Sequence, residues 1–93
     1  VNGIKLDVNG QERILDDSGV FVEIGLMPAS GFINIVEKDK WGEIIVDKRN
    51  QTNMPGIFAA GDVTDITEKQ IIVAAGEGGK ASLEIIKYLQ SKN

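Results

Sequence analysis

The sequence contains no cysteine and no histidine among its 93 residues. Without thiols the chain can form no disulfide framework, and without either residue type it offers no zinc site of the usual ligands. Catalysis by a cysteine or histidine side chain of this chain is excluded as well. Redox chemistry carried out by a bound cofactor stays open, because the cofactor itself supplies the reactive group.

Basic residues and long apolar runs are also scarce. Ten lysines and arginines against fourteen acidic residues give a net charge of −4, which lacks the basic footprint of a nucleic-acid binder. No apolar run approaches the ~20 residues of a membrane helix, and no signal-peptide pattern opens the chain. We therefore expect a cytoplasmic protein with no nucleic-acid and no membrane partner.

The remaining composition, 42% hydrophobic and 26% charged, is typical of a soluble globular protein. The length suits one small domain. The chain starts at Val1 without an initiator methionine, and Gly3 falls directly into a strand pattern. These features favour a segment of a longer protein.

The opening residues predict a β-hairpin. Apolar and polar side chains alternate over residues 4–8, the period of a half-buried strand. Asn9-Gly10 follows, and this dipeptide suits a type I′ turn because both central residues take a positive φ. A second strand is expected over residues 11–15.

Three short apolar stretches farther along read as buried strands, since they are rich in β-branched and aromatic residues. They are residues 20–24 (VFVEI), 43–47 (EIIVD) and 57–61 (IFAAG). Residues 32–36 predict a short turn or strand. Phe32 and Trp41 are interpreted as core anchors.

The final third supports two interpretations. Residues 70–90 can form one helix, with Thr67 as N-cap and Gln70 completing a capping box. Against one helix stand Gly76, Gly78 and Gly79, each of which costs ~1 kcal/mol relative to alanine inside a helix. The alternative is a strand over 70–75, a loop over 76–81 and a helix over 82–90. The residues alone leave both open.

Two phosphate-binding motifs are weighed in this segment. Gly76, Gly78 and Ala81 match the dinucleotide pattern G-x-G-x-x-A, but the acidic residue that should follow ~20 positions later on a second strand is absent. Lys80 suggests a P-loop, which requires glycine at position 74 and serine or threonine at 81. The sequence has alanine at both, so the P-loop is excluded.

The apolar run over residues 57–60 ends at Gly61-Asp62. In α/β folds, ligands bind beyond the carboxyl ends of parallel strands. Gly61 would let the backbone approach a ligand, and the carboxylate of Asp62 could accept hydrogen bonds from sugar-type hydroxyls. On chemistry alone, an ordinary turn in which Asp62 or Asp65 caps the next segment is the commoner interpretation.

Three motifs together resemble the C-terminal end of thioredoxin reductase-like flavoproteins, a family that includes the flavoprotein subunit of alkyl hydroperoxide reductase. They are GVFVEIGLMP (19–28), MPGIFAAGDVTD (54–65) and KQIIVAAGEGGKASLEIIKYL (69–89). Three motifs in this order are more specific than any one of them. The Lys-Gln pair that opens the last motif narrows the resemblance to this branch of flavoproteins.

The resemblance implies part of an FAD/NAD(P)-binding Rossmann-like α/β fold, α+β as an isolated fragment. Residues 1–18 would be the hairpin that ends an NAD(P)H-binding insert, and residues 19–93 the C-terminal part of the FAD-binding domain. It favours the single long C-terminal helix, with the helix glycines used for close packing.

The resemblance also implies the cofactor contacts. Asp62 would bind the ribityl and pyrophosphate region of FAD, with Gly61 allowing the approach. Lys69, Gln70 and Ile71 would lie at the flavin ring, where the helix N-terminus faces the pyrimidine edge and stabilises negative charge. No catalytic side chain and no metal ligand is expected.

The implied function is that of an NAD(P)H-dependent flavoprotein disulfide reductase, with electrons passing from NADPH or NADH to FAD and on to a disulfide outside this chain. Its partners would be the missing N-terminal part of the same enzyme, a thioredoxin-like or peroxiredoxin protein and a second copy in a homodimer. The chain alone would be inactive. The absence of Cys-x-x-Cys keeps a ferredoxin-reducing relative open, and a small non-catalytic α+β protein-interaction domain is the alternative from another class.

Overall fold

A two-stranded antiparallel hairpin opens the structure, a computed structural model that describes residues 1–93. Strand β1 (Gly3–Val8) pairs with strand β2 (Gln11–Asp16). Asn9 and Gly10 connect them with φ values of 54° and 80°, as a type I′ turn requires. The predicted hairpin is confirmed, and each strand is one residue longer at its outer end.

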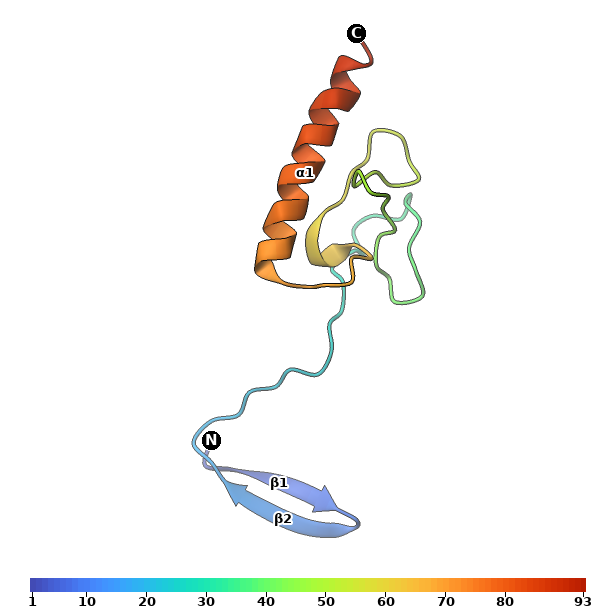
Figure 1. The fold of residues 1–93 in the computed structure, drawn as a ribbon. Coiled ribbons are helices and arrows are strands. Elements are labelled where there is room, and N and C mark those ends of the chain that lie inside the picture. The colour runs from blue at the N-terminus through green and yellow to red at the C-terminus, as the bar shows by residue number, and fades with distance from the viewer.

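An extended linker, residues 18–27, joins the hairpin to the rest of the chain (Figure 1). Residues 19–27 make no hydrogen bond, and Phe21 and Ile24 are almost completely exposed. The predicted buried strand over 20–24 is therefore wrong for this chain. Its backbone is extended, but no neighbouring strand is present to pair with it.

The linker makes the molecule elongated. Its extents are 67 × 25 × 20 Å and its radius of gyration is 19.9 Å, whereas a compact chain of this length has a radius of gyration of about 12 Å. The hairpin lies apart from the remaining residues (Figure 1). It therefore contributes nothing to their core.

The body, residues 28–93, is a set of turns packed against helix α1 (Ile71–Gln90), with the short 3₁₀ helix η1 (Gly61–Val63) between them (Figure 1). Its buried apolar residues are Val36, Ile44 and Ala81. Ile44 pairs with the segment after η1: its N–H donates to Val63 O at 2.8 Å, and its carbonyl accepts from Asp65 N at 3.0 Å. This is one parallel bridge, not a ladder.

The predicted strands over 43–47 and 57–61 are thus wrong as regular strands. The extended residues form only isolated β-bridges. Ile44 bridges with Lys38 and with Thr64, and Gln51 bridges with Phe58. Turns interrupt the backbone on both sides of each bridge. A strand buried on both faces needs neighbours along its whole length, and the body supplies none.

The aromatic side chains of the body are either exposed or half-buried. Phe32 and Trp41 are 81% and 66% exposed, so their interpretation as core anchors is wrong. Phe58 meets Tyr88 of α1 edge to face, with ring centroids 5.9 Å apart. That pair, and not the predicted one, holds the C-terminal half of the helix against the turns.

The single long C-terminal helix is confirmed, but its predicted cap is wrong. Helix α1 begins at Ile71 with Gln70 as N-cap, and no side chain caps it. Thr67 lies in the preceding loop. A Cβ atom built on Gly76, Gly78 or Gly79 meets nothing within 4 Å, so the helix glycines pack against no part of this chain. No helix here has the length and apolar character needed to cross a bilayer.

A buried amide ties the turns to the middle of α1. Asn50 is completely buried with φ of 60°, and its Nδ2 donates to Ala59 O at 2.9 Å and to the Glu77 carboxylate at 2.7 Å. The other Glu77 oxygen lies 2.9 Å from Lys80 Nζ. Hydrogen bonds from Lys80 and then from Asn50 hold the pKa of Glu77 below its ordinary value of 4.5.

This amide–carboxylate contact predicts a pH-dependent stability. A carboxyl with a lowered folded-state pKa stabilises the fold above its ordinary pKa, and the contribution is lost as pH falls through the folded value. Glu77→Gln should therefore lower the free energy of unfolding by about 1 kcal/mol at neutral pH, and the difference should vanish well below pH 4.5. Urea unfolding followed by circular dichroism measures it.

Glu84→Gln is the matched control, because Glu84 lies on the same helix and pairs only with Lys87 at 2.7 Å. It should show a smaller loss at neutral pH. Equal effects of the two substitutions would contradict the role given to Asn50.

Candidate functional site

Gly61 and Asp62 are the first two residues of the 3₁₀ helix η1 (the Asp62 turn), which packs against the first turns of α1. Gly61 is buried with φ of 81°, and a Cβ atom there would lie 3.4 Å from Ala74 Cβ. Glycine is needed for two reasons: the left-handed backbone and the close approach of the helix. In this chain, what comes close to Gly61 is α1.

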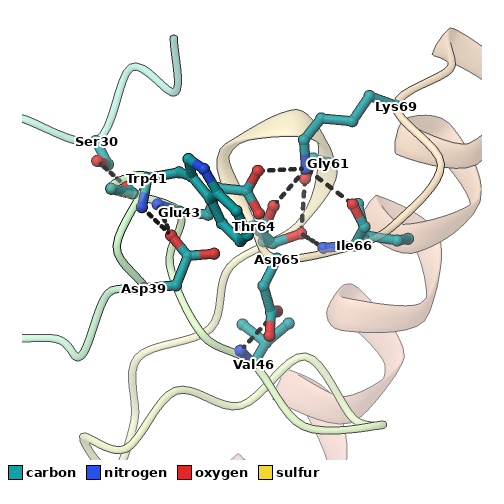
Figure 2. A network of polar contacts seen from close by, with 11 residues as sticks. Ser30, Asp39, Trp41, Glu43, Val46, Gly61, Thr64, Asp65, Ile66 and Lys69 are labelled. Carbon is teal, nitrogen blue, oxygen red and sulfur yellow. Dashed lines mark hydrogen bonds and ion pairs between the residues drawn. The ribbon is translucent and has the colours of Figure 1, made fainter. Parts of the chain in front are cut away.

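Thr64 closes this turn from the other side. It is completely buried, and both its backbone N–H (3.0 Å) and its Oγ1 (2.7 Å) donate to Gly61 O. Figure 2 shows Thr64 at the centre of the polar network. Asp62 is thereby held between two buried residues that are joined by these two hydrogen bonds.

The carboxylate of Asp62 differs from those of the other aspartates in the body. Asp39, Asp47 and Asp65 each accept at least one backbone N–H, the ordinary role of aspartate in a turn. Asp65, for example, accepts from Val46 N at 3.1 Å. Asp62 is exposed and accepts no hydrogen bond from this chain. The turn-capping interpretation therefore applies to Asp65 and not to Asp62.

A cavity of about 220 Å³ lies beside Asp62. One side of the cavity is formed by the end of the linker. The other side is formed by η1 and Lys69. The lining residues are Leu26, Met27, Pro28, Ala29, Glu43, Asp62, Val63 and Lys69. The GLMP stretch, Asp62 and Lys69, which lie far apart in the sequence, are thus brought to one place.

Lys69 is anchored by its ammonium group. Nζ donates to Thr64 O at 2.7 Å and to Ile66 O at 2.8 Å, and it lies 3.4 Å from a carboxylate oxygen of Glu43 (Figure 2). The side chains of Lys69 and Glu43 are only 14% and 20% exposed. The pair is therefore largely removed from solvent.

The start of α1 is open. Gln70 has an extended backbone, and the first helical bond runs from Ala74 N to Gln70 O at 2.9 Å. The backbone N–H groups of residues 71–73 have no partner. Ile71 and Ile72 are 91% and 79% exposed. The free N–H groups, at the positive end of the helix dipole, thus lie next to the exposed side chains of Ile71 and Ile72.

The structure brings most of the predicted site residues together. Asp62 and Lys69 line one cavity, Gly61 lies buried behind Asp62, and Gln70 and Ile71 follow directly at the helix start. Glu43 and Thr64 were missed. Thr64 could have been suspected, because a threonine three residues after a turn glycine can close the turn. Glu43 carried no signal, since its partner is distant in the sequence.

Comparison with known proteins identifies the family that the chain resembles. The sequence profile of the family described as "Pyridine nucleotide-disulphide oxidoreductase" matches residues 2–78. A subunit of the alkyl hydroperoxide reductase of Staphylococcus aureus (strain NCTC 8325 / PS 47) is 49% identical over 92 residues, covering 96% of this chain and 18% of the relative. The corresponding alkyl hydroperoxide reductase subunit of Escherichia coli (strain K12) is 47% identical over 83 residues, covering 88% and 16%.

Solved structures agree. The thioredoxin reductase of T. acidophilum superposes with a TM-score of 0.81 at 38% identity, covering 99% of this chain and 31% of that one. The thioredoxin reductase of Streptococcus pyogenes MGAS5005 gives a TM-score of 0.75 at 38% identity, covering 89% and 28%. The chain thus spans less than a fifth of the curated relatives and under a third of these structures.

Two glycine substitutions test the geometry of the site. Gly61→Ala should destabilise the chain by at least about 1 kcal/mol, because alanine disfavours the left-handed backbone and its Cβ atom would crowd Ala74. Gly76→Ala, in the open middle of α1, should stabilise it by about 1 kcal/mol. Denaturant unfolding of both variants gives the comparison. Similar shifts of the same sign would contradict this assignment.

Proposed function

The chain belongs to the pyridine nucleotide-disulphide oxidoreductase family, and on that premise we propose that it is the C-terminal FAD-binding segment of an NAD(P)H-dependent flavoprotein disulfide reductase. Bound FAD would take electrons from NADPH or NADH and pass them to a disulfide outside this chain. The segment contributes cofactor contacts and no nucleophile or general base. The free carboxylate of Asp62 carries the proposal.

Asp62 fits a hydroxyl-rich part of the cofactor. Its carboxylate is exposed, has no hydrogen-bond donor within the chain and lies beside the cavity. A carboxylate accepts bonds from hydroxyl groups, and the ribityl chain of FAD presents several. Gly61 and Thr64 keep the turn rigid, so the carboxylate needs little reordering when a ligand binds.

The start of α1 fits the ring end of the cofactor. Its free N–H groups can donate to carbonyl oxygens of the flavin pyrimidine, and the helix dipole would stabilise negative charge there. The exposed side chains of Ile71 and Ile72 suit a flat apolar ring system. Lys69, Gln70 and Ile71 would then lie at the flavin ring.

The rest of the cofactor site would come from the missing part of the enzyme. The cavity of about 220 Å³ is smaller than the roughly 300–1,000 Å³ of ordinary ligand sites. The exposed linker has the composition of a central strand, so it would join a parallel sheet of that part. The helix glycines would pack there too. We assign residues 1–18 to the end of an NAD(P)H-binding insert and residues 19–93 to the FAD-binding domain.

The whole enzyme would transfer electrons to a thioredoxin-like or peroxiredoxin protein and would act as a homodimer in the cytoplasm. Support for the acceptor comes from the relatives, which are named for alkyl hydroperoxide reduction and thioredoxin reduction. Because this chain contains no cysteine, the disulfide that accepts the electrons would lie outside it.

Removal of the Asp62 carboxylate tests the proposal. The protein to use is a full-length hybrid in which this chain replaces the matching residues of the S. aureus relative (the hybrid). Asp62→Ala should weaken FAD binding by roughly 10- to 100-fold, the effect of losing one or two hydrogen bonds to a charged group. Flavin content after dialysis and fluorescence titration measure this. Asp16→Asn, on the distant hairpin, is the charge-matched control, and an unchanged flavin content in Asp62→Ala would refute the role.

A second prediction concerns the chain alone. The isolated 93 residues should bind FAD only weakly, whereas the hybrid should purify yellow with about one flavin per chain. Absorbance spectra of the two proteins decide this. A colourless hybrid that folds would contradict the FAD-binding assignment and would favour a non-catalytic interaction domain.

A further inference from the structure

Three oxygen atoms of this chain surround the ammonium group of Lys69. An ammonium carries three N–H donors. Two of them donate to Thr64 O and Ile66 O at 2.7 and 2.8 Å, and Glu43 Oε1 forms an ion pair with the ammonium group at 3.4 Å. Because the side chain is only 14% exposed, these partners are not readily exchanged for water or a phosphate. Lys69 lies at the cavity, but its charge is neutralised inside the protein.

The carbonyls that Lys69 holds belong to the turn that carries Asp62. Thr64 accepts from Lys69 through its carbonyl and donates to Gly61 O through Oγ1. The hydrogen bonds therefore run from Lys69 through Thr64 to Gly61, the residue before Asp62 (Figure 2). The next residue after Lys69 is Gln70, the N-cap of α1. One side chain thus connects the Asp62 turn to the start of the helix.

Glu43 is itself fixed. Its N–H donates to Asp39 Oδ1 and its carbonyl accepts from Asp39 N, both at 2.9 Å. Ser30 Oγ donates to the neighbouring Gly42 carbonyl. The carboxylate that faces Lys69 therefore projects from a rigid turn (Figure 2). The ion pair thus adds a side-chain contact between two segments that the backbone bonds of Ile44 to Val63 and Asp65 already join.

We propose that Lys69 and Glu43 are a positioning pair: they fix the Asp62 carboxylate relative to the free N–H groups at the start of α1, and the Lys69 ammonium does not contact the cofactor. This inference rests on the proposed function and refines it. In this proposal, Lys69 sets the distance between the two groups that bind FAD, which are the Asp62 carboxylate and the N–H groups at the start of α1. This inference also assigns a role to Glu43, which has no other partner in the site.

Hydrogen exchange on the chain without flavin tests the positioning alone. Lys69→Met, which keeps the apolar stem, should speed exchange of the Thr64 amide about tenfold, the effect of losing one charged hydrogen bond. Glu43→Gln should act in the same direction. Lys87→Met, at an exposed helical ion pair, should have no effect on this amide. Unchanged exchange in both Lys69→Met and Glu43→Gln would overturn the positioning role.

Flavin binding by the hybrid tests how the pair acts on the cofactor. Lys69→Met and Glu43→Gln should each weaken FAD binding, by about tenfold and several-fold, and the double variant should be no worse than Lys69→Met. Both single variants should alter the visible circular dichroism of bound flavin. Lys69→Arg, which keeps the positive charge, should retain more of the affinity for FAD than Lys69→Met does.

The hydrogen-exchange and flavin-binding experiments together distinguish a failure of the positioning role from a failure of the proposed function. If Lys69→Met weakens binding while Glu43→Gln leaves it unchanged or tightens it, the ammonium contacts the cofactor directly and the inference is wrong. If the unmodified hybrid binds no FAD, the proposed function fails, and the exchange experiment still decides whether Lys69 positions the turn.

Discussion

The bridge between Ile44 and the segment around Thr64 is the interaction on which the body depends. It is the only place where the central turns, η1 and the approach to α1 are joined by backbone pairing, with bonds of 2.8 and 3.0 Å on either side of Ile44. Ile44 and Thr64 are both buried. The bridge sets the position of Glu43 on one side and of the Asp62 turn on the other. The polar network of the site is built outward from it.

Around this bridge, some polar groups have hydrogen-bond partners within the chain and others have none. Thr64, Lys69 and Asp65 have their side chains engaged within the chain. The Asp62 carboxylate and the N–H groups at the start of α1 are not engaged. These two unpaired groups lie at one exposed edge of the site, whereas the Oδ1 atom of Asn50 is buried without a hydrogen-bond partner. A ligand with hydroxyls at one end and carbonyls at the other matches that edge.

Local patterns in the sequence were sufficient for the hairpin, whereas the long helix was chosen only with the help of the resemblance. Asn9-Gly10 dictates its turn through backbone conformation alone, and the periodicity of residues 70–90 outweighs the glycines once the resemblance is considered. The strands over 20–24, 43–47 and 57–61 were not predictable in this chain, because a strand exists only where a neighbour pairs with it, and their apolar composition suits neighbours that these residues do not include. Asp62 was identified by resemblance, whereas its distinction from Asp65 required the hydrogen bonds. The role of Glu43 could not be predicted from the sequence, since only the fold brings its side chain to Lys69.

The central claim is that this chain supplies one side of a flavin site through the start of α1. Amide hydrogen exchange of the hybrid with and without FAD tests it most directly, because residues 71–73 have free N–H groups in the structure. FAD is expected to slow exchange at Ile71 and Ile72 and to leave the hairpin strands β1 and β2 unchanged. Binding of FAD without protection at the helix start would contradict the claim.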